Sequence, residues 1–255
     1  MTRATTAVLN DLATALDPSL LMEDLGLDPD PWQRRVLRST ADRLLLLCAR
    51  QSGKSTTTAC LALHTALYTP DSLVLLLSPS LRQSGELFRK VDGFYGDLGK
   101  PVPARQESAT TLALANGSRV VSLPGSPDTV RGFSGVRLLV IDEAAMTPDE
   151  LFVATAPMLA VSRGRLVALS TPLGQRGWFH SQWEDAAAPW QRVKVTAWDC
   201  PRVSREFLAE QRKLLGDRWF RQEYECSFEE TLDQVFSTDS VTKAFDTEEA
   251  PLFGG

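Results

Sequence analysis

The sequence LLLLCARQSGKS, residues 44–55, decides how this chain is expected to fold. Residues 44–49 form an unbroken apolar run of strand length, which is typical of a strand buried on both faces of a sheet. The Gly-Lys-Ser that follows opens a segment that we predict to be a helix over residues 54–68. A buried strand, a short loop and a helix, in that order, are the context that a phosphate-binding loop requires.

The residues of this loop have the chemistry to bind a nucleotide and its magnesium ion. Backbone N–H groups at the start of the helix would face the phosphates. Lys54 would neutralise the β and γ oxygens of ATP, and Ser55 would bind Mg²⁺. Cys48 stands where the usual loop has its first glycine, and the alternative interpretation is a helix N-terminus with a solvated lysine. The residues expected to contact the nucleotide here are Arg50, Gln51, Ser52, Gly53, Lys54, Ser55 and Thr56.

A second motif places two carboxylates at the end of another apolar strand, residues 138–141. Ligands of open α/β sheets bind at the carboxyl ends of the strands. Asp142 would hold the magnesium shell, and Glu143 would polarise the attacking water. An adjacent Glu favours hydrolysis over a slow nucleotide switch. The alternative is that both carboxylates cap the following helix.

Two further polar positions are expected beside the nucleotide. Ser170 and Thr171 end the apolar run 166–169, and a hydroxyl there can sense the γ-phosphate and pass its loss to the rest of the domain. The alternative for this pair is a plain strand-ending turn. Gln33 offers a donor and an acceptor, which is enough to read an adenine edge, with Trp32 packed nearby. The alternative for Gln33 is a surface amide beside a core tryptophan.

An arginine is expected near the γ-phosphate, because transferred phosphoryl charge must be neutralised in the transition state. Arg50 lies inside the loop and would act in cis. Arg131 lies on a Gly-flexed loop before the acidic strand, and its alternative is a solvated loop arginine. A chain of this length has no room for a second motor domain that could supply the arginine. A single-domain motor can take its arginine from a neighbouring subunit, which predicts a ring or an active-site dimer interface.

The pattern after residue 30 alternates strands and helices, which predicts an α/β fold with a mainly parallel sheet and helices on both faces, a P-loop NTPase of the RecA-like type. Asn116-Gly117 separates two strand-like runs and predicts a hairpin turn. Residues 205–224 are expected to form two charged helices broken near Gly216. The expected divisions are a helical extension at 1–30, the ATPase core at 31–188, a lid at 189–230 and a linker at 231–255. The other predicted elements are strands at 73–77 and 193–196 and a helix at 83–95.

Composition excludes several classes of protein. The 255 residues carry a net charge of −5, four distant cysteines and two histidines, a pattern without a disulfide framework or a His/Cys metal cluster. The longest apolar run is too short to span a membrane, and the whole fits a reducing cytoplasm. The negative charge argues against DNA binding by the whole surface, although a local patch remains compatible with it.

The motifs together resemble those of the ATPase domain of bacteriophage terminase large subunits. An upstream Gln, an Arg-Gln-x-Gly-Lys-Ser loop, an Arg-Gly before Val-Ile-Asp-Glu-Ala-Ala, and Ser-Thr-Pro occur here in the order of that family. Residues 219–224, followed by Phe228 and Val235-Phe236, resemble the lid and exit of the same domain. The resemblance covers roughly residues 30 to 236.

The resemblance implies a motor that uses ATP hydrolysis to move double-stranded viral DNA into a procapsid in the host cytoplasm. It implies a homo-oligomeric ring, usually a pentamer, docked on a portal protein and fed by a small terminase subunit, although the isolated domain is compatible with a monomer. Arg131 matches the trans-acting finger and Arg50 the loop arginine. The family's nuclease lies beyond the end of this chain, so no DNA cleavage is expected; the tail carboxylates that lack a strand are Asp239, Asp246, Glu248 and Glu249.

Two alternatives to a DNA-translocating ATPase stay open. One is a helicase-like or remodelling ATPase, and the other is an ATP-dependent assembly factor without translocation. Stimulation of turnover by duplex DNA would separate them. The candidate DNA contacts, for which the alternative is a solvated face, are Arg82, Arg89, Lys90, Arg105 and Arg119.

Overall fold

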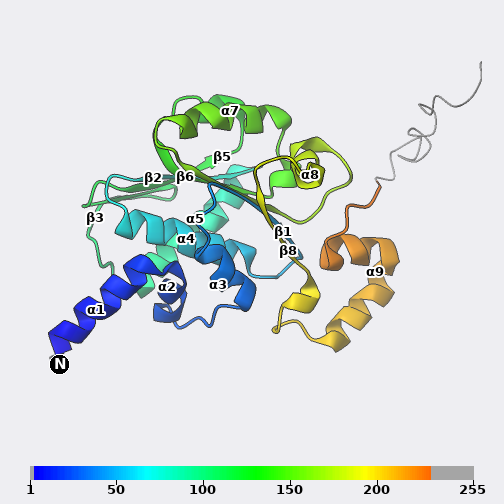
Figure 1. Cartoon of the computed structure of the whole chain (residues 1–255), viewed down its shortest axis with the longest axis horizontal. Coiled ribbons are helices and arrows are strands. Elements are labelled where there is room, and N and C mark those ends of the chain that lie inside the picture. The colour runs from blue at the N-terminus through cyan, green and yellow to red at the C-terminus, as the bar shows by residue number, and fades with distance from the viewer. Residues whose placement is uncertain (1–2, 231–255) are drawn as a thin grey trace, which may run out of the picture.

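A computed structural model describes residues 3–230 and shows a single eight-stranded sheet at its centre (Figure 1). The strands are β1 (Arg43–Cys48), β2 (Leu73–Ser78), β3 (Ala104–Glu107), β4 (Thr111–Leu114), β5 (Arg119–Pro124), β6 (Val136–Asp142), β7 (Arg165–Ser170) and β8 (Gln191–Val195). Their order across the sheet is β3-β4-β5-β2-β6-β7-β1-β8. Six of them, from β5 to β8 in that order, pair in parallel, whereas β3 and β4 form an antiparallel edge.

Helices cover both faces of this sheet, as the alternating sequence pattern predicts. In Figure 1, α4 and α5 lie below the sheet with α2 and α3, and α7 and α8 lie above it. The helices are α1 (Arg3–Leu16), α2 (Pro18–Asp24), α3 (Pro31–Leu37), α4 (Lys54–Tyr68), α5 (Leu81–Asp97), α6 (Pro127–Val130), α7 (Asp149–Ala160), α8 (Gly177–Glu184) and α9 (Arg205–Glu225), with short 3-10 turns η1 (Ala144–Met146) and η2 (Ala197–Asp199).

Strand β1 illustrates why the apolar runs form the centre of the sheet. Leu44 and Leu46 pack into the core on the side of α2–α5, and Leu45 and Leu47 pack into the core on the side of α7–α9. Successive side chains of a strand point to opposite faces, so a strand between two helical layers must be apolar at every position. The predicted α/β fold with helices on both faces is confirmed.

Several local predictions are also confirmed. Helix α4 begins and ends where the sequence predicts it. The hairpin at Asn116-Gly117 joins the antiparallel strands β4 and β5, and Gly117 has a φ of 87°. The positive φ favours glycine, and a Cβ at Gly117 would lie 2.0 Å from Oδ1 of Asp71, so the Asp71 side chain would have to move. Helix α9 is interrupted at Gly216, whose φ of 76° and ψ of 162° are not helical.

Other elements were not among the predictions, namely β3, α3, α6, α7 and α8. The segment expected as a lid starts with β8, which pairs with β1 inside the central sheet. The division at residue 189 stays a prediction. The expected linker 231–255, with Val235, Phe236 and the four tail carboxylates, lies outside the described residues. Within residues 3–230, no helix is both long and apolar enough to cross a membrane.

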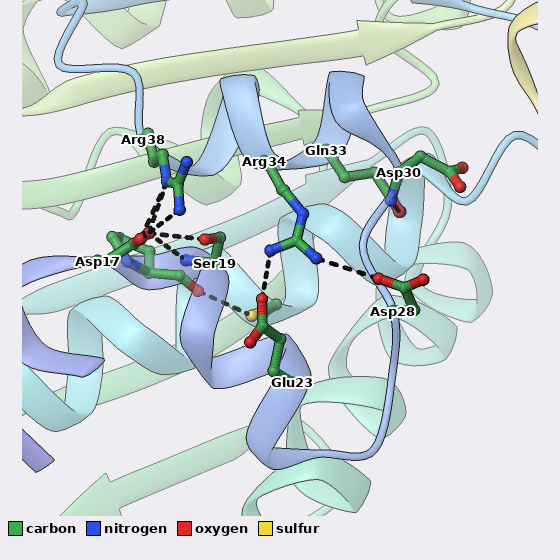
Figure 2. Close-up of polar contacts among 10 residues, drawn as sticks. Asp17, Ser19, Glu23, Asp28, Asp30, Gln33, Arg34 and Arg38 are labelled. Carbon is green, nitrogen blue, oxygen red and sulfur yellow. Dashed lines mark hydrogen bonds and ion pairs between the residues drawn. The ribbon is translucent and has the colours of Figure 1, made fainter. Parts of the chain in front are cut away.

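Ion pairs fasten the N-terminal helices to α3 (Figure 2). Arg38, at the end of α3, donates to Oδ1 of Asp17 at 3.1 Å and to Oδ2 at 3.0 and 2.6 Å. This contact lowers the pKa of Asp17 to about 2. Arg34 binds Asp28 at 3.0 Å and also pairs with Glu23. The start of α3, where Gln33 lies, is therefore held between α2 and the body of the domain.

Candidate active site

The candidate site lies where β1, β6 and β7 end. Strand β7 pairs with β1 on one side and with β6 on the other. Ser170 is in register with Leu47, and Asp142 with Leu169. The loop after β1 and the carboxylates after β6 are therefore separated by the width of one strand. Parallel pairing brings these segments to one edge, although they are far apart in the sequence.

The loop between β1 and α4 is held by backbone contacts from the C-terminal part of the chain. The Ala49 N–H donates to the carbonyl of Val195 at 2.8 Å, and the Arg50 N–H donates to the carbonyl of Glu223 at 3.1 Å. Gly53 has a φ of 92° and caps α4 in the left-handed conformation. A Cβ on Gly53 would lie 3.0 Å from Nε2 of Gln33. Conformation and space together require glycine at this point.

Lys54 and Glu143 meet across the edge of the sheet. Nζ of Lys54 lies 3.0 Å from Oε1 of Glu143, and the two side chains are only 11% and 25% exposed. Glu143 adopts a φ of 50° and a ψ of 45°, a left-handed conformation that is costly for a residue with a Cβ. This turn directs the Glu143 side chain back toward the start of α4.

Asp142 is an almost fully buried carboxylate beside this pair. Burial raises its pKa to about 6, and the negative charge of Glu143 acts in the same direction. Lys54 and hydrogen bonds from the Glu143 N–H and the Ser55 side chain oppose that rise in pKa. The Glu143 N–H donates to Oδ1 of Asp142 at 2.9 Å. The site thus places an ionisable carboxylate, whose oxygens could bind a metal ion, next to a serine hydroxyl.

Ser170 contributes a hydroxyl at the end of the strand between these motifs. The side chain is 1% exposed, and its Oγ has no hydrogen-bond partner among the described residues. A hydroxyl at this place can both donate and accept a hydrogen bond at the edge where the loop and the carboxylates meet. Thr171, which follows it, is half-buried.

Gln33 is buried next to the loop rather than exposed on the surface. Its Nε2 donates to Oγ1 of Thr57 at 2.8 Å, and its Oε1 accepts from the Asp30 N–H at 2.8 Å. Oγ1 of Thr57 in turn donates to the Gly53 carbonyl at 3.0 Å. Trp32 packs into the core on the side of α2–α5. The structure therefore brings Gln33 to the loop, as the sequence predicts.

Arg202 is a residue of this site that the sequence did not reveal. Its guanidinium donates to both carboxylate oxygens of Asp30, at 2.9 and 2.7 Å. The same group donates to the Ser52 carbonyl at 3.2 Å. Arg202 and Gln33 help to line a pocket of about 580 Å³ beside the loop. Asp30 and Arg202 are 172 residues apart, so no local pattern links them.

Comparison with known proteins assigns this arrangement to a family. Residues 45–243 match the family model described as "Terminase large subunit, T4likevirus-type, N-terminal". The chain belongs to the terminase large-subunit family. The predicted resemblance is thereby confirmed.

Curated terminases are similar to this chain over most of its length. The large subunit of Thermus virus P23-45 is 28% identical in an alignment 252 positions long that covers 84% of this chain and 52% of that protein. The large subunit of Escherichia phage T5 is 26% identical in an alignment 235 positions long that covers 88% of this chain and 53% of that protein. The chain therefore spans about half the length of the curated relatives it matches.

Solved terminases share its fold. The large terminase ATPase domain of Thermus phage P74-26 superposes with a TM-score of 0.68 and 26% identity, covering 82% of this chain and 97% of that chain. The HK97 bacteriophage large terminase superposes with a TM-score of 0.64 and 17% identity, covering 78% of this chain and 50% of that chain. A large terminase from a thermophilic bacteriophage, solved in complex with ADP, has a TM-score of 0.61 and 12% identity, covering 82% and 52%. At such low identities the last two show the fold alone.

The two candidate arginines of this terminase domain lie in different surroundings. Arg50 is 68% exposed at its side chain, and its Nε pairs with the carboxylate of Glu223 in α9. Arg131 is 71% exposed and lies 3.5 Å from Asp128 in its own turn. It lines a pocket of about 700 Å³ with residues of α7, and residues 49–56 do not line that pocket. Among residues 3–230, the ion pair of Arg131 is with Asp128 and not with a residue of the loop.

The candidate DNA contacts lie on three elements, α5, β3 and β5. Lys90 Nζ donates to Oγ1 of Thr56 at 3.3 Å and so lies over the first turn of α4. Arg89 pairs with Glu86 on its own helix. The other three, Arg82, Arg105 and Arg119, are exposed. Which residues contact DNA stays a prediction.

Proposed function

We propose that this domain hydrolyses ATP with Mg²⁺ and that hydrolysis drives double-stranded viral DNA into a procapsid. The observation that carries the proposal is the convergence of Lys54, Glu143 and Asp142 with Ser55 at one edge of the sheet. A phosphate-binding cation, a water-activating carboxylate and a metal-binding pair are the groups that phosphoryl transfer to water needs. The relationship to solved terminase ATPase domains supports the same activity.

The Lys54–Glu143 ion pair suggests how nucleotide binding prepares the site. In the structure each side chain neutralises the other at 3.0 Å. The β- and γ-phosphates carry more negative charge than one carboxylate, so Lys54 is expected to transfer to the phosphates. Glu143 then loses its partner and becomes available to accept a proton from the attacking water. Hydrolysis would therefore begin only when the triphosphate is bound in the position that draws Lys54 away from Glu143.

The oxygen atoms of Asp142 and Ser55 fit a magnesium ion. Magnesium is bound through one or two carboxylates plus substrate phosphates, so a larger acidic cluster is not needed. Among residues 3–230 there is no group of three or more His, Cys, Asp or Glu side chains that could hold a metal. The buried Asp142 carboxylate, whose pKa is raised, gains most from a nearby cation. A bound magnesium ion would supply positive charge to the transferred phosphoryl group.

The pocket beside the loop suits the adenine base. Met22 and Leu27 supply apolar surface, and Gln33 supplies a polar edge. The Nε2 group has a second N–H and Oε1 has a second lone pair, so Gln33 can contact a base while keeping both of its present bonds. The buried hydroxyl of Ser170, with Thr171, would sense the γ-phosphate from the other side of the loop.

We further propose that the domain works in a homo-oligomeric ring on a portal protein, with a small terminase subunit, in the host cytoplasm. Arg131 would act in trans, because its exposed side chain is free to reach a neighbouring subunit. Arg50 would act in cis once it leaves Glu223. The proposed parts of the chain are the core at 31–188 and the lid at 189–230, preceded by the helical extension 1–30 and followed by the linker 231–255.

ATP turnover measured across protein concentration, with and without duplex DNA, tests the proposal. We expect turnover that requires Mg²⁺, rises more steeply than protein concentration and increases when duplex DNA is added. No Mg²⁺-dependent turnover under any of these conditions would contradict the proposed activity. ATP turnover that does not change when duplex DNA is added would instead favour an assembly factor.

A further inference from the structure

The pocket beside the loop is built from three separate parts of the chain. Its walls come from residues 22–33, from Gly53 and Thr56 at the start of α4, and from Pro201 and Arg202 after η2. A site assembled from distant segments depends on the contacts that hold those segments in register. The polar contacts of this pocket form one continuous series.

Gln33 has a fixed orientation in that pocket. Its oxygen accepts from the Asp30 N–H and its nitrogen donates to Thr57, each at 2.8 Å. Rotation of the amide by half a turn would bring its NH₂ group against the Asp30 N–H, two donors facing each other. Figure 2 shows Gln33 and Asp30 side by side at the start of α3. The remaining N–H and lone pair of Gln33 therefore point in set directions.

Asp30 is in turn fixed by Arg202. The carboxylate is only 7% exposed and accepts two hydrogen bonds from the guanidinium. Such paired contacts between a guanidinium and a carboxylate fix the orientation of both groups. Arg202 is anchored to the loop through the Ser52 carbonyl, at 3.2 Å. Asp30 therefore links the two side chains: its backbone N–H donates to Gln33, and its carboxylate accepts from Arg202.

Arg202 and Gln33 also approach the loop at the same residue. A Cβ built on Gly53 would lie 3.0 Å from Nε2 of Gln33 and 3.3 Å from a terminal nitrogen of Arg202. Both side chains therefore close over the last residue before α4. Loss of Arg202 would release Asp30 and open space beside Gln33 at once.

We propose that Arg202 is a positioning residue that sets the preference of this pocket for adenine over guanine by holding Asp30 and, through it, Gln33. This inference rests on the proposed ATP function. A fixed amide presents one donor and one acceptor, which match N7 and the N6 amino group of adenine. Guanine presents two acceptors, O6 and N7, so one of them faces the amide oxygen. An amide that is free to rotate can leave this paired geometry, donate to one of the two guanine acceptors and keep its oxygen away from the other, so the discrimination is lost.

Titration calorimetry of the full chain with Mg·ADP and Mg·GDP tests the inference without hydrolysis. We expect Arg202→Met to reduce the ratio of ADP to GDP affinity by about tenfold, or ~1.4 kcal/mol. Asp30→Asn is expected to reduce it to a similar extent, and the double variant no further than either single one, because both residues act through Gln33. Arg205→Met, which removes an exposed arginine at the start of α9, is the matched control and should keep the wild-type ratio.

Each of the following three results would overturn the inference. Equal losses of ADP and GDP affinity in Arg202→Met would mean that Arg202 contacts the nucleotide or only stabilises the fold, and would overturn the inference. Wild-type protein that binds ADP and GDP equally would overturn it while leaving hydrolysis possible. Wild-type protein that binds neither would overturn the proposed function as well.

Thermal melting of every variant checks that it is folded. Should Arg202→Met be unfolded, Arg202→Lys keeps the charge and loses the planar pair of donors. An affinity ratio in Arg202→Lys below the wild-type ratio supports the inference. An unchanged ratio in this variant overturns it.

Discussion

Lys54 and Glu143 form an ion pair across two strand ends, with Nζ and Oε1 3.0 Å apart. The side chain proposed to hold phosphate and the side chain proposed to activate water are thus each other's partner in the structure. Glu143 makes this contact from a left-handed backbone conformation, which is costly for a glutamate. The pair therefore connects nucleotide binding with the availability of the base.

The first prediction concerns that base. Glu143→Gln should lower ATP turnover at least about 100-fold, because the amide cannot accept the proton of the attacking water. ATP affinity should be equal to or higher than that of the wild type, since Lys54 no longer has a competing anion. Steady-state turnover and equilibrium binding measure the two quantities separately.

Glu206→Gln, an exposed change at the start of α9, is the matched control and should leave turnover unchanged. Normal turnover in Glu143→Gln would remove Glu143 from the mechanism.

The second prediction tests whether Arg131 acts in trans. Arg131→Ala alone should bind ATP but turn it over slowly, because the side chain lies outside the pocket of its own loop. Mixing it with a Lys54→Ala subunit should restore part of the activity. In a mixed ring, an intact loop can then face an intact arginine. Turnover across mixing ratios measures this recovery.

Arg163→Ala, another exposed arginine, serves as the control for charge loss and should be active without mixing. If no mixing ratio restores turnover of Arg131→Ala, the residue acts in cis or has no catalytic part.

The third prediction concerns pH. The pKa of Asp142 is raised from 3.8 to about 6, so the folded state holds this proton more tightly than the unfolded state. Its contribution to stability is therefore greatest below pH 3.8, declines as the pH rises to about 6 and is constant above that. Asp142→Asn removes the cost of the buried charge and should raise the free energy of unfolding at pH 7.5 by about 1–3 kcal/mol.

Urea unfolding in the presence of EDTA, repeated from pH 4 to pH 8, measures this difference. The difference in the free energy of unfolding between Asp142→Asn and the wild type should become smaller toward pH 4. Asp97→Asn, an exposed change on α5, should alter stability by less than about 0.5 kcal/mol. A gap that stays constant with pH would contradict the buried-charge explanation.

The fourth prediction separates backbone strain from a steric clash in the hairpin. Gly117 and Gly99 both have positive φ values, 87° and 72°. A Cβ on Gly117 would meet Asp71, whereas one on Gly99 meets nothing within 4 Å. Gly99→Ala should cost about 1–2 kcal/mol from the backbone alone. Gly117→Ala should cost more than Gly99→Ala, because the exposed Asp71 side chain must move as well.

Urea unfolding midpoints of both variants give this comparison. Equal losses of stability would mean that Asp71 rearranges freely and that only the backbone conformation matters.

The sequence predicted those parts of the molecule that follow from a local pattern. The apolar runs in the sequence form strands β1, β2, β6 and β7. They could be predicted because a strand between two helical layers is apolar on both of its faces. The start of α3 also had a local signal that was not used. Asp30 precedes a proline at the first helical position and a glutamine at the third, which is a recognisable N-terminus.

The parts that the sequence did not predict depend on contacts between distant segments. Helix α7 contains Pro157, which argues against a helix when only neighbours are considered. Arg202 belongs to the site because the end of β8 returns to the loop, and nothing near residue 202 indicates Asp30. The sequence offered Arg50 as a cis candidate and Arg131 as a trans candidate, but their ion pairs with Glu223 and Asp128 became visible only in the folded protein.

The attachment of the phosphate loop to α9 has a consequence for work done by the domain. Arg50 contacts Glu223 through both its backbone and its side chain, and α9 is jointed at Gly216. Nucleotide that displaces Arg50 must therefore break these contacts or carry the end of α9 along. Because coupling between two sites is reciprocal, a load on α9 would change the affinity of the loop for the nucleotide that we propose it binds.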